Sequence, residues 1–169
     1  HHASVQPGSN LVYIPSYRIP HSKKEAMEKM VQEMLAKDVI QDSTSPWSSP
    51  MLMVPESNGK WRCVIVYRRL NHITIPEPFP VPSLRMLLLK IGNGNMIFST
   101  MDLNKGFFQI KVHPDSITYT AFSTPQGHYE FKKMPQGMRN SPLTFSKLMA
   151  IAMSGLVGSD VFVYLDDLL

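Results

Sequence analysis

The stretch that decides the fold is Val161-Phe162-Val163-Tyr164-Leu165-Asp166-Asp167, close to the end of the 169-residue chain. Residue types that favour strands run directly into two adjacent carboxylates. Neighbouring like charges repel each other and disfavour burial, so a bare acidic pair is unusual after a strand. A bound divalent cation removes that penalty, because hard cations prefer clustered carboxylate oxygens. The stretch therefore predicts a strand that carries two carboxylates to a metal site.

A third carboxylate, Asp102, ends another apolar strand, which is predicted from Ile97 to Leu103. Aspartates from two strands that meet at one sheet edge could bridge two magnesium ions about 4 Å apart. Such ions activate an attacking hydroxyl and stabilise a leaving phosphate oxygen. On these residues alone an alternative stays open, in which Asp166-Asp167 is a polar hairpin turn and Asp102 caps a loop.

Outward from these strands, helical and extended patterns mix without regular alternation, which favours an α+β fold over a parallel doubly wound sheet. Ser22-Lys23-Lys24-Glu25 is a capping-box pattern, so a helix is predicted from Ser22 to about Lys37. Further helices are predicted over residues 83–91 and after Ser141-Pro142. Strands or extended segments are predicted at residues 51–55, 61–67, 106–112, 119–124 and 128–132, with a hairpin turn at 57–60.

The apolar stripes of two helices identify their buried faces. Those residues are Met27, Met30, Val31, Met34, Leu35, Phe145, Leu148, Met149, Ala152, Met153 and Leu156. Residues 1–20 are rich in proline and form an extended lead-in, so the predicted division is 1–20 and 21–169.

Composition excludes several classes of protein. Apolar residues make up 43% and charged residues 18%, which is typical of a globular chain. No apolar run approaches the roughly 18 residues of a membrane span, and no signal peptide is recognisable. We therefore expect no membrane partner and an intracellular protein, with a cytoplasmic particle and the nucleus equally open. The chain begins without methionine, as expected of the middle of a longer frame or an incomplete gene model.

Cysteine and charge add two weaker constraints. The single cysteine, Cys63, excludes intramolecular disulfides and multi-cysteine zinc sites, and its strand context predicts a buried small hydrophobic residue. Lysine and arginine number 17 against 13 aspartates and glutamates. That mild basic excess is compatible with a polyanionic partner, although many ordinary domains share it.

Tyr164-Leu165-Asp166-Asp167 resembles the Tyr-x-Asp-Asp box of reverse transcriptases. Three further blocks resemble that family in the same order. The first block is Trp61-Arg62 together with residues 67–71, and the second is Met101-Asp102-Leu103 together with residues 106–110. The third block comprises residues 119–122, 127–131, 134–137, 140–142 and 144–145. Residues 17–20 and 45–50 resemble the lead-in of gypsy-type long-terminal-repeat retrotransposon Pol polyproteins. The likeness covers residues 17–169, and so many ordered blocks reduce the hairpin-turn alternative to a minor one.

The resemblance implies a right-hand polymerase, with fingers and a partial palm but no thumb. It places Asp102, Asp166 and Asp167 as catalytic carboxylates and, with Leu103, as the metal site for two Mg²⁺ ions, for which Mn²⁺ could substitute. The implied function is RNA-directed DNA polymerase, in which the primer 3′-hydroxyl attacks the α-phosphate of a dNTP and expels pyrophosphate. The implied partners are an RNA or DNA template with its primer.

The resemblance also assigns residues that contact the nucleotide and the primer. Phe107 would lie under the sugar and exclude a 2′-hydroxyl, and Gln136 would line the 3′-hydroxyl pocket. Arg62 would pack on the base and reach the triphosphate. The alternatives are that Phe107 is a core residue, that Gln136 is an exposed turn amide, and that Arg62 is a surface ion-pair partner. Tyr164 and Leu165 would pack beneath the primer terminus.

The chain departs from the family pattern in three places, and the aromatic residue beside Phe107 has a different expected role. Phe108 is expected in the core. Lys60 is the only basic residue of the fingertip segment 54–60, and Val66 stands where the family usually has an acid. The chain ends at Leu169, before the return strand of the aspartate hairpin, the primer grip and the thumb.

Because of that ending, this fragment is expected to be inactive alone. The thumb, ribonuclease H and integrase are expected elsewhere in a full element. One rival is a decayed or host-retained relic that only folds and weakly binds nucleic acid, and a remote second rival is an unrelated soluble α+β binding domain.

Overall fold

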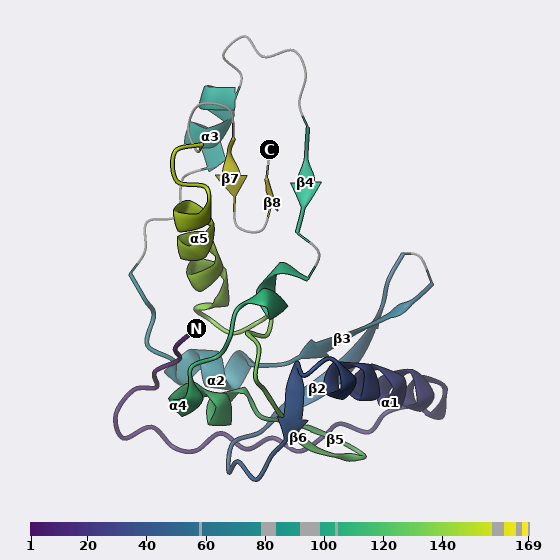
Figure 1. The fold of residues 1–169 in the computed structure, drawn as a ribbon. Coiled ribbons are helices and arrows are strands. Elements are labelled where there is room, and N and C mark those ends of the chain that lie inside the picture. The colour runs from purple at the N-terminus through teal and green to yellow at the C-terminus, as the bar shows by residue number, and fades with distance from the viewer. Residues whose placement is uncertain are drawn as a thin grey trace.

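The computed structural model describes residues 1–57, 59–78, 84–91, 99–103, 105–156, 161–164 and 167–168. In that part of the chain, two sheets of unequal size are packed with helices (Figure 1). This mixture of helices and strands agrees with the predicted α+β class. The described helices include none that is long and apolar enough to cross a membrane.

The larger sheet has five strands in the order β1-β6-β5-β2-β3. Its members are β1 (Ile40–Asp42), β2 (Ser49–Pro55), β3 (Trp61–Ile65), β5 (Phe122–Thr124) and β6 (Gly127–Phe131). β2 and β3 form an antiparallel hairpin from Met51↔Ile65 to Pro55↔Trp61, which confirms the hairpin predicted around Gly59. β2 pairs with β5 in parallel, so the sheet is mixed.

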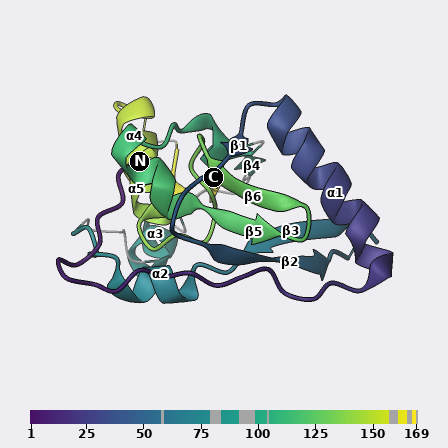
Figure 2. The same ribbon diagram turned by 90° about the horizontal axis from the view of Figure 1, so that it is seen from below.

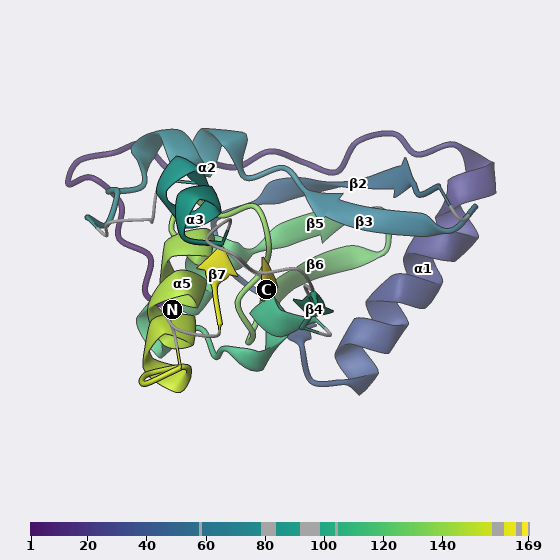
Figure 3. The same cartoon turned by 90° about the horizontal axis from the view of Figure 1, so that it is seen from above.

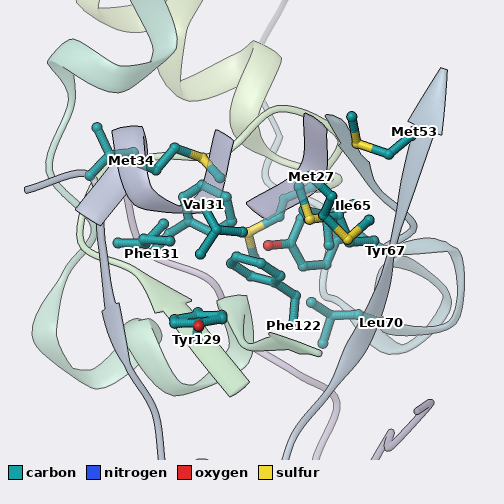
Figure 4. Packing of buried hydrophobic residues seen from close by; sticks show 14 of the residues in the cluster. Met27, Val31, Met34, Met53, Ile65, Tyr67, Leu70, Phe122, Tyr129 and Phe131 are labelled. Atoms are coloured by element: carbon teal, nitrogen blue, oxygen red, sulfur yellow. The ribbon is translucent and has the colours of Figure 1, made fainter. Parts of the chain in front are cut away.

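Helix α1 (His21–Ala36) buries Met27, Val31 and Met34, as its apolar stripe predicts. Figure 4 shows these side chains packed over the aromatic rings of Phe122 and Phe131 from the sheet. Each buried side chain of this kind contributes roughly 1.5–3 kcal/mol of transfer free energy. The predicted capping box is wrong. The helix begins one residue earlier, with Pro20 at the N-cap position and no side-chain cap.

The strand predicted to Tyr67 ends at Ile65, because Tyr67 turns inward and the chain continues as helix α2 (Arg68–Ile73). Tyr67 is 1% exposed, and its hydroxyl donates to the carbonyl oxygen of Thr120 at 2.7 Å. Burial raises the pKa of this phenol well above its usual value. Cys63 is only partly buried, not fully as predicted, and burial raises the pKa of its thiol.

The extended segment predicted at 106–112 is wrong. Lys105 has a positive φ of 51°, and the chain then forms the 3₁₀ helix η1 (Gly106–Gln109). Two more short helices follow, α4 (Pro114–Ile117) and η2 (Thr118–Thr120). The Thr120 hydroxyl donates to the carbonyl oxygen of Ile117 at 2.6 Å, a local bond that competes with strand formation and delays β5 to Phe122.

The smaller sheet has the order β4-β8-β7, from β4 (Met101–Asp102), β7 (Val163–Tyr164) and β8 (Asp167–Leu168). Figures 1 and 3 show it beside α3 (Leu84–Ile91) and α5 (Ser141–Ala152). The expectation that the chain ends before the return strand is corrected by β8, whose two residues pair with both neighbours. Residues 97–98 of the predicted Ile97–Leu103 strand lie outside the described residues.

A second apolar cluster connects α5 to the smaller sheet. It contains Phe107, Val112, Met134, Phe145 and Met149, with Val161 and Val163 packed against it. Pro142 stands in the first turn of α5, as predicted. Leu148 and Leu156 are 43% and 52% exposed, so the predicted stripe is only partly buried.

Candidate active site

The backbone brings two of the predicted carboxylate positions together. Asp102 on β4 is the Cα partner of Asp167 on β8, and Asp167 is in turn the partner of Tyr164 on β7. Directly opposed residues of antiparallel strands have Cα atoms about 4.5–5.5 Å apart. Three candidate positions therefore form one row across the sheet. Leu165 and Asp166, also predicted here, lie outside the described residues.

The chain leaves β4 through a tightly packed turn. The amide of Gly106 donates to the carbonyl oxygen of Leu103 at 3.1 Å, so this carbonyl already accepts one hydrogen bond. A Cβ atom at Gly106 would lie only 2.9 Å from two ring carbons of Phe145. Any larger residue at this position would force η1 or the Phe145 ring to shift. The turn that follows Asp102 is therefore packed against the second apolar cluster.

The two adjacent phenylalanines belong to different clusters. Phe107 is 9% exposed and stacks on Phe145, with ring centroids 5.0 Å apart and an angle of 17° between the ring planes. Phe108 is partly buried, packs against the apolar cluster between α1 and the larger sheet, and stacks on Phe131 with ring centroids 6.1 Å apart, so its expected core position is met only in part. The Phe107 ring thus belongs to the cluster that packs against the smaller sheet, which carries Asp102. Its role under the sugar of a nucleotide stays a prediction.

Two predicted nucleotide-binding residues, 74 positions apart in sequence, meet in the structure. The Arg62 guanidinium on β3 donates through Nη2 to Oε1 of Gln136, which lies in the loop between β6 and α5. Both side chains are exposed. A planar guanidinium has five donors, so one bond to Gln136 leaves others available for a ligand.

The loop that carries Gln136 is held by residues that sequence reasoning missed. The Asn71 side-chain amide donates to the carbonyl oxygen of Gly137 at 2.8 Å and accepts from the amide of Arg139, also at 2.8 Å. Asn140 is 2% exposed, and its side chain bonds to the backbone of Ile75 and Glu77. Asn71 and Asn140 both lie inside the blocks that resemble the family, and this position was the one sequence signal that could have identified them.

Helix α1 braces the hairpin that carries Arg62. The Lys23 ammonium lies 4.6 Å from the centroid of the Trp61 ring, a cation–π contact. Elsewhere, Lys132 forms an ion pair with Asp38, and its hydrogen bond is the main cause of the lowered pKa of that carboxyl. Lys132 is therefore engaged within the protein, whereas Arg68 and Arg69 are exposed on α2.

Comparison with known proteins gives a consistent result. Residues 54–169 match the family model described as "Reverse transcriptase (RNA-dependent DNA polymerase)". The chain is 42% identical over 163 residues to the retrovirus-related Pol polyprotein from transposon 297 of Drosophila melanogaster, covering 94% of this chain and 15% of that protein. It is 32% identical over 164 residues to the retrovirus-related Pol polyprotein from transposon gypsy of the same organism, covering 94% of this chain and 16% of that protein.

Solved structures agree on the fold. A crystal structure of a prototype foamy virus protease-reverse transcriptase mutant superposes with a TM-score of 0.83 at 24% identity, covering 97% of this chain and 22% of that one. The foamy viral protease-reverse transcriptase in complex with an RNA/DNA hybrid gives 0.81 at 25% identity, with the same coverage. The chain thus spans about a fifth of these structures and less of the polyproteins.

Proposed function

The chain belongs to the reverse transcriptase family, and on that premise we propose that it carries part of the polymerase active site of a gypsy-type retrotransposon Pol polyprotein. The proposed reaction is transfer of a deoxynucleotide to a primer 3′-hydroxyl, directed by an RNA or DNA template. The observation that carries the proposal is the row of backbone partners Asp102, Asp167 and Tyr164 across the smaller sheet.

The donor chemistry of this row fits divalent metal ions. Asp102, Asp166 and Asp167 would hold two Mg²⁺ ions, with Leu103 beside them, and carboxylate oxygens are the ligands that Mg²⁺ prefers. When bound, such ions activate the attacking hydroxyl and stabilise the leaving oxygen. Bound cations would also explain why these like-charged carboxylates are tolerated so close together.

Arg62 and Gln136 are proposed to bind the incoming nucleotide. Arg62 would contact the base and the triphosphate, since a planar fork suits both. Its hydrogen bond to Gln136 supports the assignment, because it holds the exposed guanidinium beside the loop that would form the 3′-hydroxyl pocket. The Asn71 side chain also holds this loop, through its hydrogen bonds to the backbone of Gly137 and Arg139.

Phe107 is proposed to select deoxynucleotides. Its stack on Phe145 holds the ring against movement, so a 2′-hydroxyl that clashed with it would not be accommodated by rotation. Tyr164 and Leu165 would lie beneath the primer terminus. In this assignment the five-stranded sheet with α1 belongs to the fingers, and the three-stranded sheet belongs to the front of the palm.

We also propose that the isolated 169-residue chain is catalytically silent but binds a primer–template duplex weakly. Strands of two residues hold the aspartate row, and displacement of reacting groups by an ångström can cost about a hundredfold in rate. The basic residues proposed to contact phosphates are Arg62, Arg68, Arg69, Lys132 and Lys133, of which Lys132 also pairs with Asp38. Binding should therefore weaken as salt rises.

The decayed or host-retained relic is the second candidate, because Val66 stands where the family usually has an acid and Lys60 is the only basic residue of segment 54–60. Single-turnover primer extension distinguishes the candidates, using this chain extended by the downstream residues of its own frame, with Mg²⁺ and with Mn²⁺. The enzyme should extend a primer, and Asp166→Asn should abolish extension while leaving duplex binding in place. A folded, duplex-binding protein without extension under either ion would favour the relic.

A further inference from the structure

Two histidines and one aspartate gather where the first residues of the chain meet α4. His2, His113 and Asp115 each offer one ligand atom, and these atoms all lie within 4.8 Å of one another. The imidazole centroids of His2 and His113 are 5.1 Å apart, and Nδ1 of His113 lies 3.6 Å from Oδ2 of Asp115. We propose that these three side chains form a surface site for Zn²⁺ or a similar transition-metal dication, separate from the aspartate row.

The spacing suits such an ion. Zinc bonds to imidazole nitrogen and carboxylate oxygen are about 2.0–2.2 Å long, so tetrahedral ligand atoms lie roughly 3.4 Å apart. The His113–Asp115 pair already has nearly this separation, at 3.6 Å. Because all three residues are exposed, rotation of the side chains can close the wider pair without moving the core. Three protein ligands leave the fourth position to water.

The backbone holds the three residues in place before any ion binds. The amide of His113 donates to the carbonyl oxygen of His1 at 2.7 Å. The amide of Ala3 donates to the hydroxyl of Ser116 at 2.9 Å, and Ala3 is 3% exposed. His2 therefore lies between two anchored neighbours, and Figure 2 shows the amino terminus beside α4.

The tautomer of His2 decides which of its two ring nitrogens can bind a metal. Nδ1 of His2 lies 3.2 Å from the hydroxyl of Ser4. When Nδ1 carries the proton, the lone pair of Nε2 is available to a metal, and ligating histidines commonly have an oxygen partner on the other nitrogen. An ion at Nδ1 of His113 would replace a long hydrogen bond of 3.4 Å from the amide of Asp115, which is a small loss.

The donor set separates this site from the proposed magnesium site. Imidazole nitrogen suits zinc, copper and nickel, whereas magnesium prefers oxygen ligands. Because His2 belongs to the lead-in and the other two residues flank Pro114, a bound ion would tie the lead-in to α4. Binding to the folded state alone raises the thermal unfolding midpoint.

Calorimetric titration of the metal-free 169-residue chain with Zn²⁺, together with thermal unfolding, tests the proposal. We expect one saturable site, a higher unfolding midpoint with Zn²⁺, and neither effect with Mg²⁺. His2→Ala and His113→Asn should each weaken Zn²⁺ binding at least about tenfold, the loss that removal of even an outer-shell partner can cause. Asparagine keeps an acceptor at the N-cap of α4, so we expect this variant to fold.

Two control variants locate the site. His21→Ala removes an exposed histidine at the start of α1, and His1→Ala removes the neighbour whose Nδ1 bonds to Thr144. Both should bind Zn²⁺ as the parent chain does. The proposal is overturned if the parent shows no saturable Zn²⁺ binding, or if binding survives in His2→Ala and is lost in either control. If His113→Asn fails to fold, Asp115→Asn decides in its place.

Discussion

Replacing Tyr67 with phenylalanine removes one buried hydroxyl group and keeps the ring. The side chain is 1% exposed, and its hydroxyl donates to the carbonyl oxygen of Thr120 at 2.7 Å. A typical hydrogen bond contributes about 0.5–1.5 kcal/mol net, and a buried acceptor without its donor costs about 1–3 kcal/mol. We therefore expect Tyr67→Phe to lower the free energy of unfolding by about 1–3 kcal/mol.

The same substitution should change the alkaline limb of stability. Burial raises the pKa of Tyr67 in the folded state, so the unfolded chain releases this proton at lower pH. The contribution of Tyr67 is therefore fully present below about pH 10, its unfolded pKa, and is lost as pH rises toward the folded pKa. Tyr67→Phe should remove that loss, so its stability should fall less steeply above about pH 10.

Urea denaturation followed by circular dichroism, at neutral pH and near pH 10.5, measures both effects. Tyr13→Phe is the matched control, because Tyr13 is 58% exposed and its change should stay within about 0.5 kcal/mol. The reasoning is refuted if Tyr67→Phe is as stable as Tyr13→Phe at neutral pH. An unchanged alkaline slope in Tyr67→Phe would refute the burial argument separately.

Three further outcomes follow from the site. Gly106→Ala places a Cβ 2.9 Å from the Phe145 ring and should lower the free energy of unfolding by about 1–3 kcal/mol, measured by urea denaturation. An unchanged urea midpoint would show that the surrounding side chains relax without cost. In the extended polymerase, Phe107→Val should admit ribonucleotides in single-nucleotide extension, and unchanged discrimination would make Phe107 a core residue only. Arg62→Lys keeps the charge but loses the fork, so dNTP affinity should fall about 10–100-fold by pre-steady-state titration, whereas equal affinity would remove Arg62 from the site.

The parts of the fold that sequence predicts are those governed by local periodicity. Met27, Val31 and Met34 recur at helical spacing and are buried together, because one face of α1 covers the sheet. Gly59 marks the β2–β3 hairpin, and its positive φ of 76° is the conformation that glycine readily adopts. The acidic motifs also predicted that Asp102 and Asp166 would converge. Asp102 is the backbone partner of Asp167, and the approach of Asp102 to Asp166 stays a prediction.

The parts that sequence reasoning missed depend on tertiary contacts. Residues 106–109 have an extended-looking pattern but form a 3₁₀ helix, in which Gly106 packs closely on the Phe145 ring from a distant part of the sequence. Similarly, the amide of Asn71 clamps a loop 66 residues away, which no local pattern indicates. The bond between Arg62 and Gln136 was not foreseen either, although each residue was assigned separately from the family motifs.

Anomalous diffraction from a crystal of the extended protein soaked with Mn²⁺ and a dNTP tests the central claim most directly. The proposed site predicts Mn²⁺ peaks bound by the carboxylates of Asp102 and Asp166, with the triphosphate reaching Arg62. Carboxylates of Asp102 and Asp166 more than about 10 Å apart, too far to share metal ions about 4 Å from each other, would contradict the assignment.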